Sequence, residues 1–189
     1  MAKVTLQSVR LSFPHLFTPQ AGTEGGEPKY NATFIVEPGS ANAKALAKAV
    51  EQVAKEKWTD KAAGVLAQLR KTDKVCYRES EKTNQSGDVY AGFEDAHWVS
   101  ASDKVRPTVI DRDKTPLTAA DGRPYGGCYV NAIIEVWAQD NAYGKRINAS
   151  LKGVQFVKNG DAFSGGAPAS ADEFDVVDAP EDDLVDDLA

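Results

Sequence analysis

Hydrophobic and polar residues alternate along several short segments of this chain, which is the pattern of half-buried β-strands. In residues 3–13 the alternation is interrupted, and a strand with a β-bulge near Ser8 explains the interruption. Residues 127–140 form a long segment rich in β-branched and aromatic residues. The strands expected from these patterns are 3–13, 30–38, 97–103, 106–113, 127–140 and 145–157.

Between the second and third of these strands, the hydrophobic period changes to that of an α-helix. Leu46, Val50 and Val53 fall on one helical face after Ser40, whose hydroxyl suits a helix N-cap. The lysines on the other face are read as solvent-exposed. A second, shorter helix is expected over 60–69, so the two helices form an insertion at about 41–69.

Glycine, proline and polar residues mark the connections between the expected elements. Loops are predicted at 14–29 and 115–127, and the turn at 84–88 predicts a hairpin of 74–79 with 88–93. Five or more strands, many antiparallel, with one helical insertion indicate a mainly β fold that closes as a small barrel or a curved sheet.

The charges are distributed unevenly along the chain. The formal net charge is −6, from 22 Lys and Arg against 28 Asp and Glu. From Asn159 to Ala189 there are ten acidic residues and no basic one, so the rest of the chain carries a formal charge of +4. We expect a domain over 1–163 and a disordered acidic tail over 164–189, because the tail has too few apolar residues to fold alone. This asymmetry is typical of a polyanion-binding domain with an interaction tail.

The motifs of the common enzyme classes are absent from the sequence. There is no GxxxxGK[ST], GxGxxG, GxSxG or HExxH. His15 and His97 have no partner suggested by the sequence, and packing or a surface hydrogen bond accounts for each. Asp111 and Asp113 share one face of a strand, but the interleaved basic residues Arg112 and Lys114 favour a salt-bridged strand end over a metal site. We therefore expect no catalytic residues, no metal and no cofactor.

Cys76 and Cys128 do not form a CxxC pair and are interpreted as small buried residues. No apolar run approaches the roughly 20 residues that a membrane span needs. The N-terminus has no signal-peptide pattern, so we expect a cytoplasmic protein without membrane contact, in which the two cysteines form no disulfide.

Basic and aromatic residues interleave in the middle and late strands and in their loops. A protein that binds single-stranded nucleic acid without sequence preference needs a positive groove and aromatic faces for base stacking. This pattern predicts such a groove. Its candidate residues are Tyr77, Arg78, Trp98, Lys104, Arg106, Arg112, Arg123, Tyr125, Tyr143, Lys145 and Arg146.

The acidic tail is punctuated by small apolar residues, a spacing that suits a peptide docking into basic, partly apolar pockets. The tail can also mimic DNA and compete with it for the basic groove, which makes DNA binding dependent on salt. The candidate partner-binding residues are Glu181, Asp182, Asp183, Leu184, Asp186, Asp187 and Leu188.

Several segments together resemble a family of tailed-phage single-stranded DNA-binding proteins. They are VRLSFPHLFTP, KYNATFIVEP, a Lys- and Ala-rich helix ending in Trp58, GDVYAGFEDAHWVSAS, and the stretch from GGCYVNAIIEVWAQD to KNGDAF. The resemblance covers residues 3 to about 166. It implies an OB-fold, a five-stranded antiparallel barrel, with long excursions, working in phage replication or recombination in the host cytoplasm.

The resemblance also implies that the acidic tail recruits replication or recombination enzymes. Many such tails end in phenylalanine, whereas this chain ends Asp-Asp-Leu-Ala. We expect a monomer or a weak homodimer, and the sequence leaves a preference between DNA and RNA open. An alternative is an interaction adaptor whose tail carries the function, and a further one is a metal-dependent nuclease that uses Asp111 and Asp113.

Overall fold

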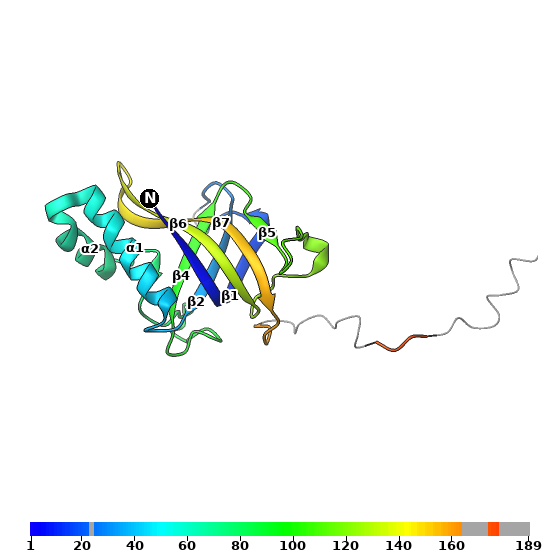
Figure 1. The fold of residues 1–189 in the computed structure, drawn as a ribbon. Helices are drawn as coiled ribbons and strands as arrows, with labels where there is room; N and C mark the ends of the chain where they lie inside the picture. The colour runs from blue at the N-terminus through cyan, green and yellow to red at the C-terminus, as the bar shows by residue number, and fades with distance from the viewer. Residues whose placement is uncertain (23–24, 164–173, 178–189) are drawn as a thin grey trace, which may run out of the picture.

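The computed structural model describes residues 1–22, 25–163 and 174–177. Within these residues the chain forms one mixed sheet, two α-helices and two short 3-10 helices (Figure 1). The elements are β1 (Ala2–Gln20), β2 (Lys29–Val36), α1 (Ala41–Trp58), η1 (Thr59–Lys61), α2 (Ala62–Lys71), β3 (Tyr77–Arg78), β4 (His97–Asp103), β5 (Thr108–Ile110), η2 (Ala119–Asp121), β6 (Tyr129–Asn141) and β7 (Gly144–Lys158).

The sheet has the order β3-β4-β2-β1-β6-β7-β5 and curls until its two sides meet. The segment 74–76 closes the gap between β4 and β7. Cys76 N donates to Ile147 O at 2.9 Å, Ile147 N donates to Lys74 O at 3.0 Å, and Ser100 N donates to Cys76 O at 3.1 Å. The five long strands therefore run around a barrel in the order β1-β2-β4-β7-β6, which confirms the expected OB-like barrel.

Three irregularities interrupt the pairing of the long strand β1, the last of them between His15 and Gln20. The first lies between Leu6 and Val9, where Ser8 has a φ of 50° and its N–H donates to Asn131 Oδ1, so the predicted bulge is confirmed. The second lies between Ser12 and His15. Such bulges bend a strand, which lets β1 pair with β6 through its first half and with β2 through its second half.

The prediction that 14–29 is a loop is wrong over its first part, because β1 continues to Gln20. Past the second irregularity β1 pairs with β2 alone, through His15 with Asn31 and Gln20 with Lys29. Proline is tolerated in such a segment because one edge of the strand needs no ladder hydrogen bond. The two prolines of this segment, Pro14 and Pro19, therefore signal an unpaired edge and not the end of the strand.

The predicted hairpin of 74–79 with 88–93 does not form. Only Tyr77 and Arg78 are extended, and they pair with β4. Residues 79–96 form an excursion held by the single bridge Thr83–Val89 and a local apolar cluster around Phe93. The strand predicted at 106–113 shrinks to β5, which runs parallel to β7, because the chain turns back at Asp111–Lys114.

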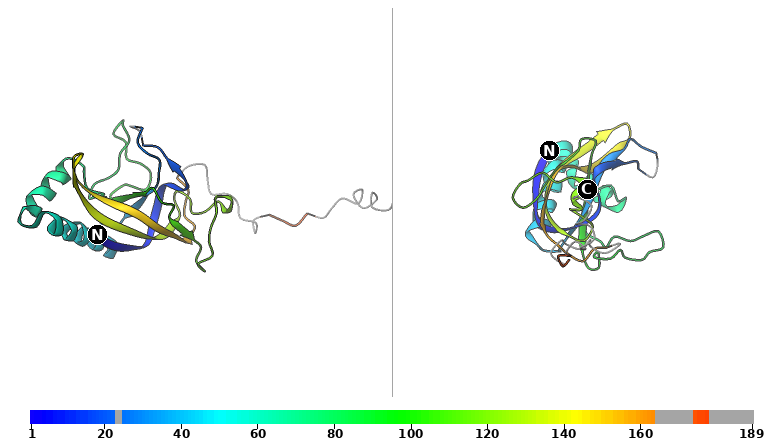
Figure 2. Two further views of the ribbon diagram at one scale, coloured as in Figure 1. Left: turned by 90° about the horizontal axis from the view of Figure 1, so that it is seen from above. Right: turned by 90° about the vertical axis from the view of Figure 1, so that its right-hand side faces the viewer.

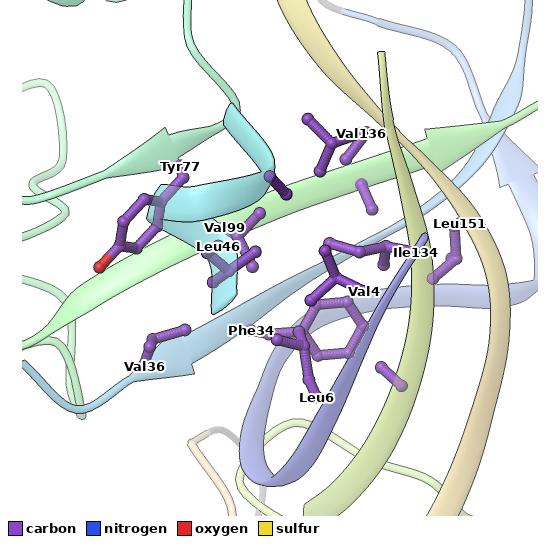
Figure 3. Packing of buried hydrophobic residues seen from close by; sticks show 14 of the residues in the cluster. Val4, Leu6, Phe34, Val36, Leu46, Tyr77, Val99, Ile134, Val136 and Leu151 are labelled. Carbon is purple, nitrogen blue, oxygen red and sulfur yellow. The ribbon is translucent and has the colours of Figure 1, made fainter. Parts of the chain in front are cut away.

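Helix α1 begins as predicted at Ser40, whose Oγ accepts a hydrogen bond from Ala43 N. Figure 1 shows α1 and α2 at one end of the barrel, with β5 near the opposite end. The apolar face of α1 joins the barrel interior, where Leu46 packs in the same cluster as Leu6, Phe34 and Ile134 (Figure 3). The helical insertion therefore plugs one end of the barrel and leaves the outer faces of β2 and β4 uncovered by helices.

No helix among the described residues is long and apolar enough to cross a membrane. The acidic tail falls almost entirely beyond the described part of the chain. Of its residues the structure places Phe174–Val177, with Phe174 71% exposed. The candidate tail residues lie outside the described residues, namely Glu181, Asp182, Asp183, Leu184, Asp186, Asp187 and Leu188.

Candidate nucleic-acid interface

The outer faces of β2 and β4 form the floor of a groove. Ala32, Phe34 and Val36 point into the core, so the alternate residues of β2 face outward. On the floor Asn31 lies opposite Ser102 and Thr33 opposite Ser100, with the two hydroxyls of the second pair 3.2 Å apart. Small hydroxyl and amide groups at these positions can exchange hydrogen bonds with any nucleotide.

The groove consists of two adjoining hollows of about 620 and 700 Å³, which share Lys29, Asn31 and Ser102. The β6–β7 hairpin bounds one side, and Tyr143 at its tip is 91% exposed. The connection between β1 and β2 bounds the other, where Lys104 Nζ lies 2.5 Å from Glu27 Oε2. The left panel of Figure 2 shows both hairpins projecting on the same side of the barrel.

Positive charge dominates the 620 Å³ hollow. Its lining residues include one carboxylate, Asp73, which pairs with Arg78 at 3.1 Å. Among the described residues no carboxylate lies within 4 Å of Lys82 Nζ. Burial lowers the pKa of Arg78 and of Lys82, and the Arg78 charge lowers the Lys82 pKa further. A partly desolvated and uncompensated cluster of cations favours an anionic ligand. The cationic residues that line this hollow are Lys29, Lys74, Arg78, Lys82 and Arg146.

Two tryptophans stand at the same hollow. Trp98 lies on the outer face of β4 with its ring covered by Lys82 Nζ at 4.1 Å and by the Arg78 guanidinium at 5.2 Å from the ring centroid. Its indole N–H is buried and has no acceptor among the described residues. Trp137 on β6 is half-buried and donates to Ser150 Oγ at 3.1 Å. The half-buried ring of Trp137 supplies the kind of surface on which unpaired bases stack, whereas Trp98 is only 9% exposed beneath its two cations.

The structure brings together part of the predicted residue set at this groove. Arg78, Trp98 and Arg146 line the 620 Å³ hollow, and Lys104 and Tyr143 line the 700 Å³ hollow. Lys145 lies next to them on the hairpin, where its ammonium is 3.6 Å from Asp140.

Tyr77 lies elsewhere, in the hydrophobic core. Its side chain is 6% exposed, and its hydroxyl lies 2.8 Å from His97 Nδ1. Burial, together with the charge of Glu79, raises the pKa of Tyr77 to about 12. A ring held in this way has no free face for a base, so its prediction as a DNA contact is not supported by its position.

Four other predicted residues gather away from the groove, beside the loop at 111–127. Arg123 pairs with Asp111 at 2.6 Å, and this hydrogen bond is the main cause that lowers the Asp111 pKa. Arg112 donates to Val157 O, and the Tyr125 hydroxyl bonds to Asn159 and Gly160. The fourth, Arg106, lies over the ring of Phe17 at 5.5 Å. These contacts fix loops to the end of the barrel. The interleaved basic and aromatic residues that the sequence assigned to one groove therefore belong to two separate regions.

Several groove residues were missed from the sequence, namely Lys29, Asn31, Thr33, Lys74, Lys82, Ser100, Ser102 and Trp137. For Trp137 a signal existed, because it shares its strand parity with Asn131, Glu135 and Gln139, and polar partners mark an outward face. No sequence signal pointed to Lys82, because its position depends on how the 79–96 excursion folds.

The alternative of a metal site at Asp111 and Asp113 has no support in the geometry. Asp111 is engaged by Arg123, and Asp113 accepts a hydrogen bond from Thr115 N. Within residues 1–22, 25–163 and 174–177 no three His, Cys, Asp or Glu side chains come close enough to hold a metal ion.

Both cysteines are free thiols, and Cys76 lines the floor of the groove. Burial raises the pKa of Cys76 to about 12 and that of Cys128 to about 11. At pH 8 both groups are therefore protonated, and the thiolate is the reactive form. We expect Ellman's reagent to modify the folded protein at least tenfold more slowly than the urea-unfolded chain. A folded protein that reacts as fast as the unfolded one contradicts this burial.

Comparison with known proteins connects this geometry to a family. The family described as Enterobacter phage Enc34, ssDNA-binding protein, matches residues 2–185. Protein p50 of Acyrthosiphon pisum secondary endosymbiont phage 1 is 42% identical over 184 residues, which cover 96% of this chain and 97% of p50.

Solved structures are similar as well. The single-stranded DNA-binding protein from bacteriophage Enc34 in complex with ssDNA is 28% identical with a TM-score of 0.69, covering 86% of this chain and 89% of that one. The single-stranded DNA-binding protein gp2.5 of bacteriophage T7 is 10% identical with a TM-score of 0.56, covering 90% and 99%. At that identity the T7 protein shows a shared fold only.

Proposed function

This chain belongs to the Enc34 family of phage single-stranded DNA-binding proteins, and from that premise we propose that it binds single-stranded DNA in the groove over β2 and β4 without sequence preference. The observation that carries the proposal is the lining of the 620 Å³ hollow, five cationic side chains against one carboxylate. Phosphates are the ligands that such a lining favours.

The position of the groove supports the same proposal. OB-folds bind oligonucleotides on the face of their second and third strands, between the first-to-second and fourth-to-fifth strand connections. In this barrel those strands are β2 and β4, and the connections are the β1–β2 loop and the β6–β7 hairpin. The Enc34 protein that was solved with ssDNA has the same fold.

Sequence independence follows from what the groove offers to a strand. Its floor consists of hydroxyls and amides that accept any base or sugar, and Trp137 offers ring surface, which every base can stack on. No row of long, fixed donors among the described lining residues matches one base edge, as a site for direct readout would require. We infer that the protein covers and protects whatever single strand replication or recombination exposes.

The acidic tail has two roles in this proposal. It recruits replication or recombination enzymes through its terminal acidic and apolar residues, and it competes with DNA for the cationic groove. Support comes from the charge distribution, since ten acidic residues follow Asn159 without a basic one, while the DNA-facing hollow is cationic. Opposite charges on one chain attract each other, and salt screens that attraction.

The test is a titration of fluorescent oligo-dT and of a duplex of equal length with the full chain, at 50 and 300 mM salt. We expect the single strand to bind at least tenfold more tightly than the duplex, and its affinity to fall with salt. Equal affinity for the duplex would overturn the proposal of single-strand specificity. Absence of binding to both ligands would favour the adaptor alternative.

Removing the tail is expected to strengthen DNA binding. A chain ending at Gly166 lacks nine of the ten acidic residues after Asn159, so the groove loses an internal competitor. At low salt we expect affinity for oligo-dT to rise about three- to tenfold, and at high salt the two chains should converge because the competition is electrostatic. Unchanged affinity at low salt would argue against tail competition and leave the DNA-binding proposal intact.

A further inference from the structure

A further cavity, of about 600 Å³, lies beside the groove, and five aromatic residues contribute to its lining. We call it the aromatic pocket. Phe13 and Phe17 of β1, Tyr90 of the 79–96 excursion, Tyr125 of the long loop and Phe163 contribute to its lining. Cavities of this size accept small organic groups. The groove over β2 and β4 does not include these residues.

Phe13 is held in the aromatic pocket by an unusual backbone. It lies at the second irregularity of β1, and its φ of 47° is in the left-handed region that a bulky residue rarely adopts. A bulge at such a place re-aims a side chain. The ring meets Tyr90 edge-on at 5.0 Å between centroids, yet 40% of the residue stays exposed. This arrangement keeps an aromatic surface accessible where burial in the core would have stabilised the fold more.

The charge of the aromatic pocket suits a nucleotide. Arg123 is the single charged residue among the described side chains that line it, and its guanidinium is paired with Asp111 at 2.6 Å. Stacked bases require ring faces, and the phosphates that follow them require a cation nearby. The rings of the pocket meet the first requirement, and Lys82, whose ammonium lies 6.0 Å from the Phe13 ring centroid, meets the second.

Lys82 connects the aromatic pocket to the groove. Its ammonium lies 4.1 Å from the centroid of Trp98, which lines the groove, and 6.0 Å from the centroid of Phe13, which lines the aromatic pocket. The two cavities are thus neighbours on either side of one cation. A single strand leaving the groove past Trp98 meets this cation next and then the ring of Phe13.

We propose that the aromatic pocket receives an unstacked base from the same DNA strand that lies in the groove, with Lys82 contacting the phosphate between them. This inference rests on the proposed function and extends the binding path beyond the β2 and β4 face. A peptide is the alternative occupant of the aromatic pocket. The continuity of the pocket with the groove and the uncompensated charge of Lys82 favour a nucleic acid.

The experiment compares short and long oligonucleotides on the full chain. Phe13→Leu keeps apolar volume and removes the stacking face. We expect it to leave binding of dT4 within twofold of the native value, because about four nucleotides is the smallest site of an OB-fold and such a short strand is proposed to lie in the groove alone. Binding of dT12 is expected to weaken about tenfold, the loss of one stacked base. Ile133→Ala serves as the control, since Ile133 is also 40% exposed but lies on β6 outside both cavities.

A second measurement does not depend on a variant. An oligonucleotide carrying 5-iododeoxyuridine at successive positions is photocrosslinked to the native chain, and we expect one position to crosslink to Phe13 or Tyr90. Equal binding of dT12 by the native and Phe13→Leu chains, with no crosslink in the aromatic pocket, would overturn the inference.

Two further outcomes are informative. A synthetic peptide of residues 168–189 that shifts the Phe13 and Tyr90 resonances, when dT12 does not, would assign the aromatic pocket to a peptide and overturn the inference. If neither chain binds any oligonucleotide, the proposed function itself fails. If the Phe13→Leu chain binds dT12 as tightly as the native chain does, only the proposed extension of the binding path fails, and the proposed function stands.

Discussion

Reversing the charges of Lys82 and Arg146 together is expected to lower the affinity for oligo-dT at least a hundredfold at 50 mM salt. Both side chains line the 620 Å³ hollow of the groove, and Lys82 has no carboxylate within 4 Å among the described residues. The double change removes two phosphate contacts and adds two negative charges to the path of the strand. Repulsion then acts where the native protein attracts.

The measurement is a titration of fluorescent oligo-dT at several salt concentrations. For single strands the logarithm of affinity falls with the logarithm of salt by about 0.7 for each phosphate contact. The Lys82→Glu/Arg146→Glu chain should therefore show a slope shallower by about 1.4. A loss of affinity with an unchanged slope would point to a damaged fold instead of lost phosphate contacts.

A matched control separates local contacts from net charge. Lys48 and Lys55 are exposed on α1, at the helical end of the barrel, and neither lines the groove. Lys48→Glu/Lys55→Glu changes the net charge by the same amount. We expect its affinity to stay within about threefold of the native value. A hundredfold loss in this control would mean that total charge, and not the groove, governs binding.

Phe34→Ala is expected to lower the free energy of unfolding by about 3–5 kcal/mol, the cost of deleting a large buried aromatic side chain. Phe34 has no exposed surface and packs with Leu6 and Val99 inside the barrel. It also sits next to Thr33 on the strand that floors the groove. The cavity left behind therefore loosens β2 at the place where DNA is proposed to bind.

Urea unfolding followed by tryptophan fluorescence measures this effect. Phe174→Ala is the control, because Phe174 is 71% exposed and exposed positions change stability by less than about 0.5 kcal/mol. A loss below about 1 kcal/mol for Phe34→Ala would show that the barrel centre is not packed around this ring. In dilute buffer, surviving folded protein should still bind oligo-dT, since Phe34 does not face the groove.

Local patterns determined most of the secondary structure and the kind of ligand. The helix Ala41–Trp58 depends on neighbours a few residues away, and the bulge at Ser8 shows as a break in the local alternation of apolar and polar residues, so both can be predicted from the sequence. The surplus of basic residues in the domain, with the acidic tail, indicated a polyanion as ligand before any fold was known. The prolines at 14 and 19 were read as loop signals, but 14–20 is strand, because this part of β1 pairs with β2 alone and its other edge needs no backbone donor.

Tertiary structure alone decided which of the basic and aromatic residues share a site. The groove collects side chains from 29–33, 73–82, 98–102 and 137–149, which meet only because the barrel closes through Cys76 and Ile147. Arg78 and Arg123 look equivalent in the sequence, yet one lines the groove and the other pairs with Asp111 near the far end. The composition gives the number of charges but not their positions, because the pairing of distant strands sets the face on which each charge lies.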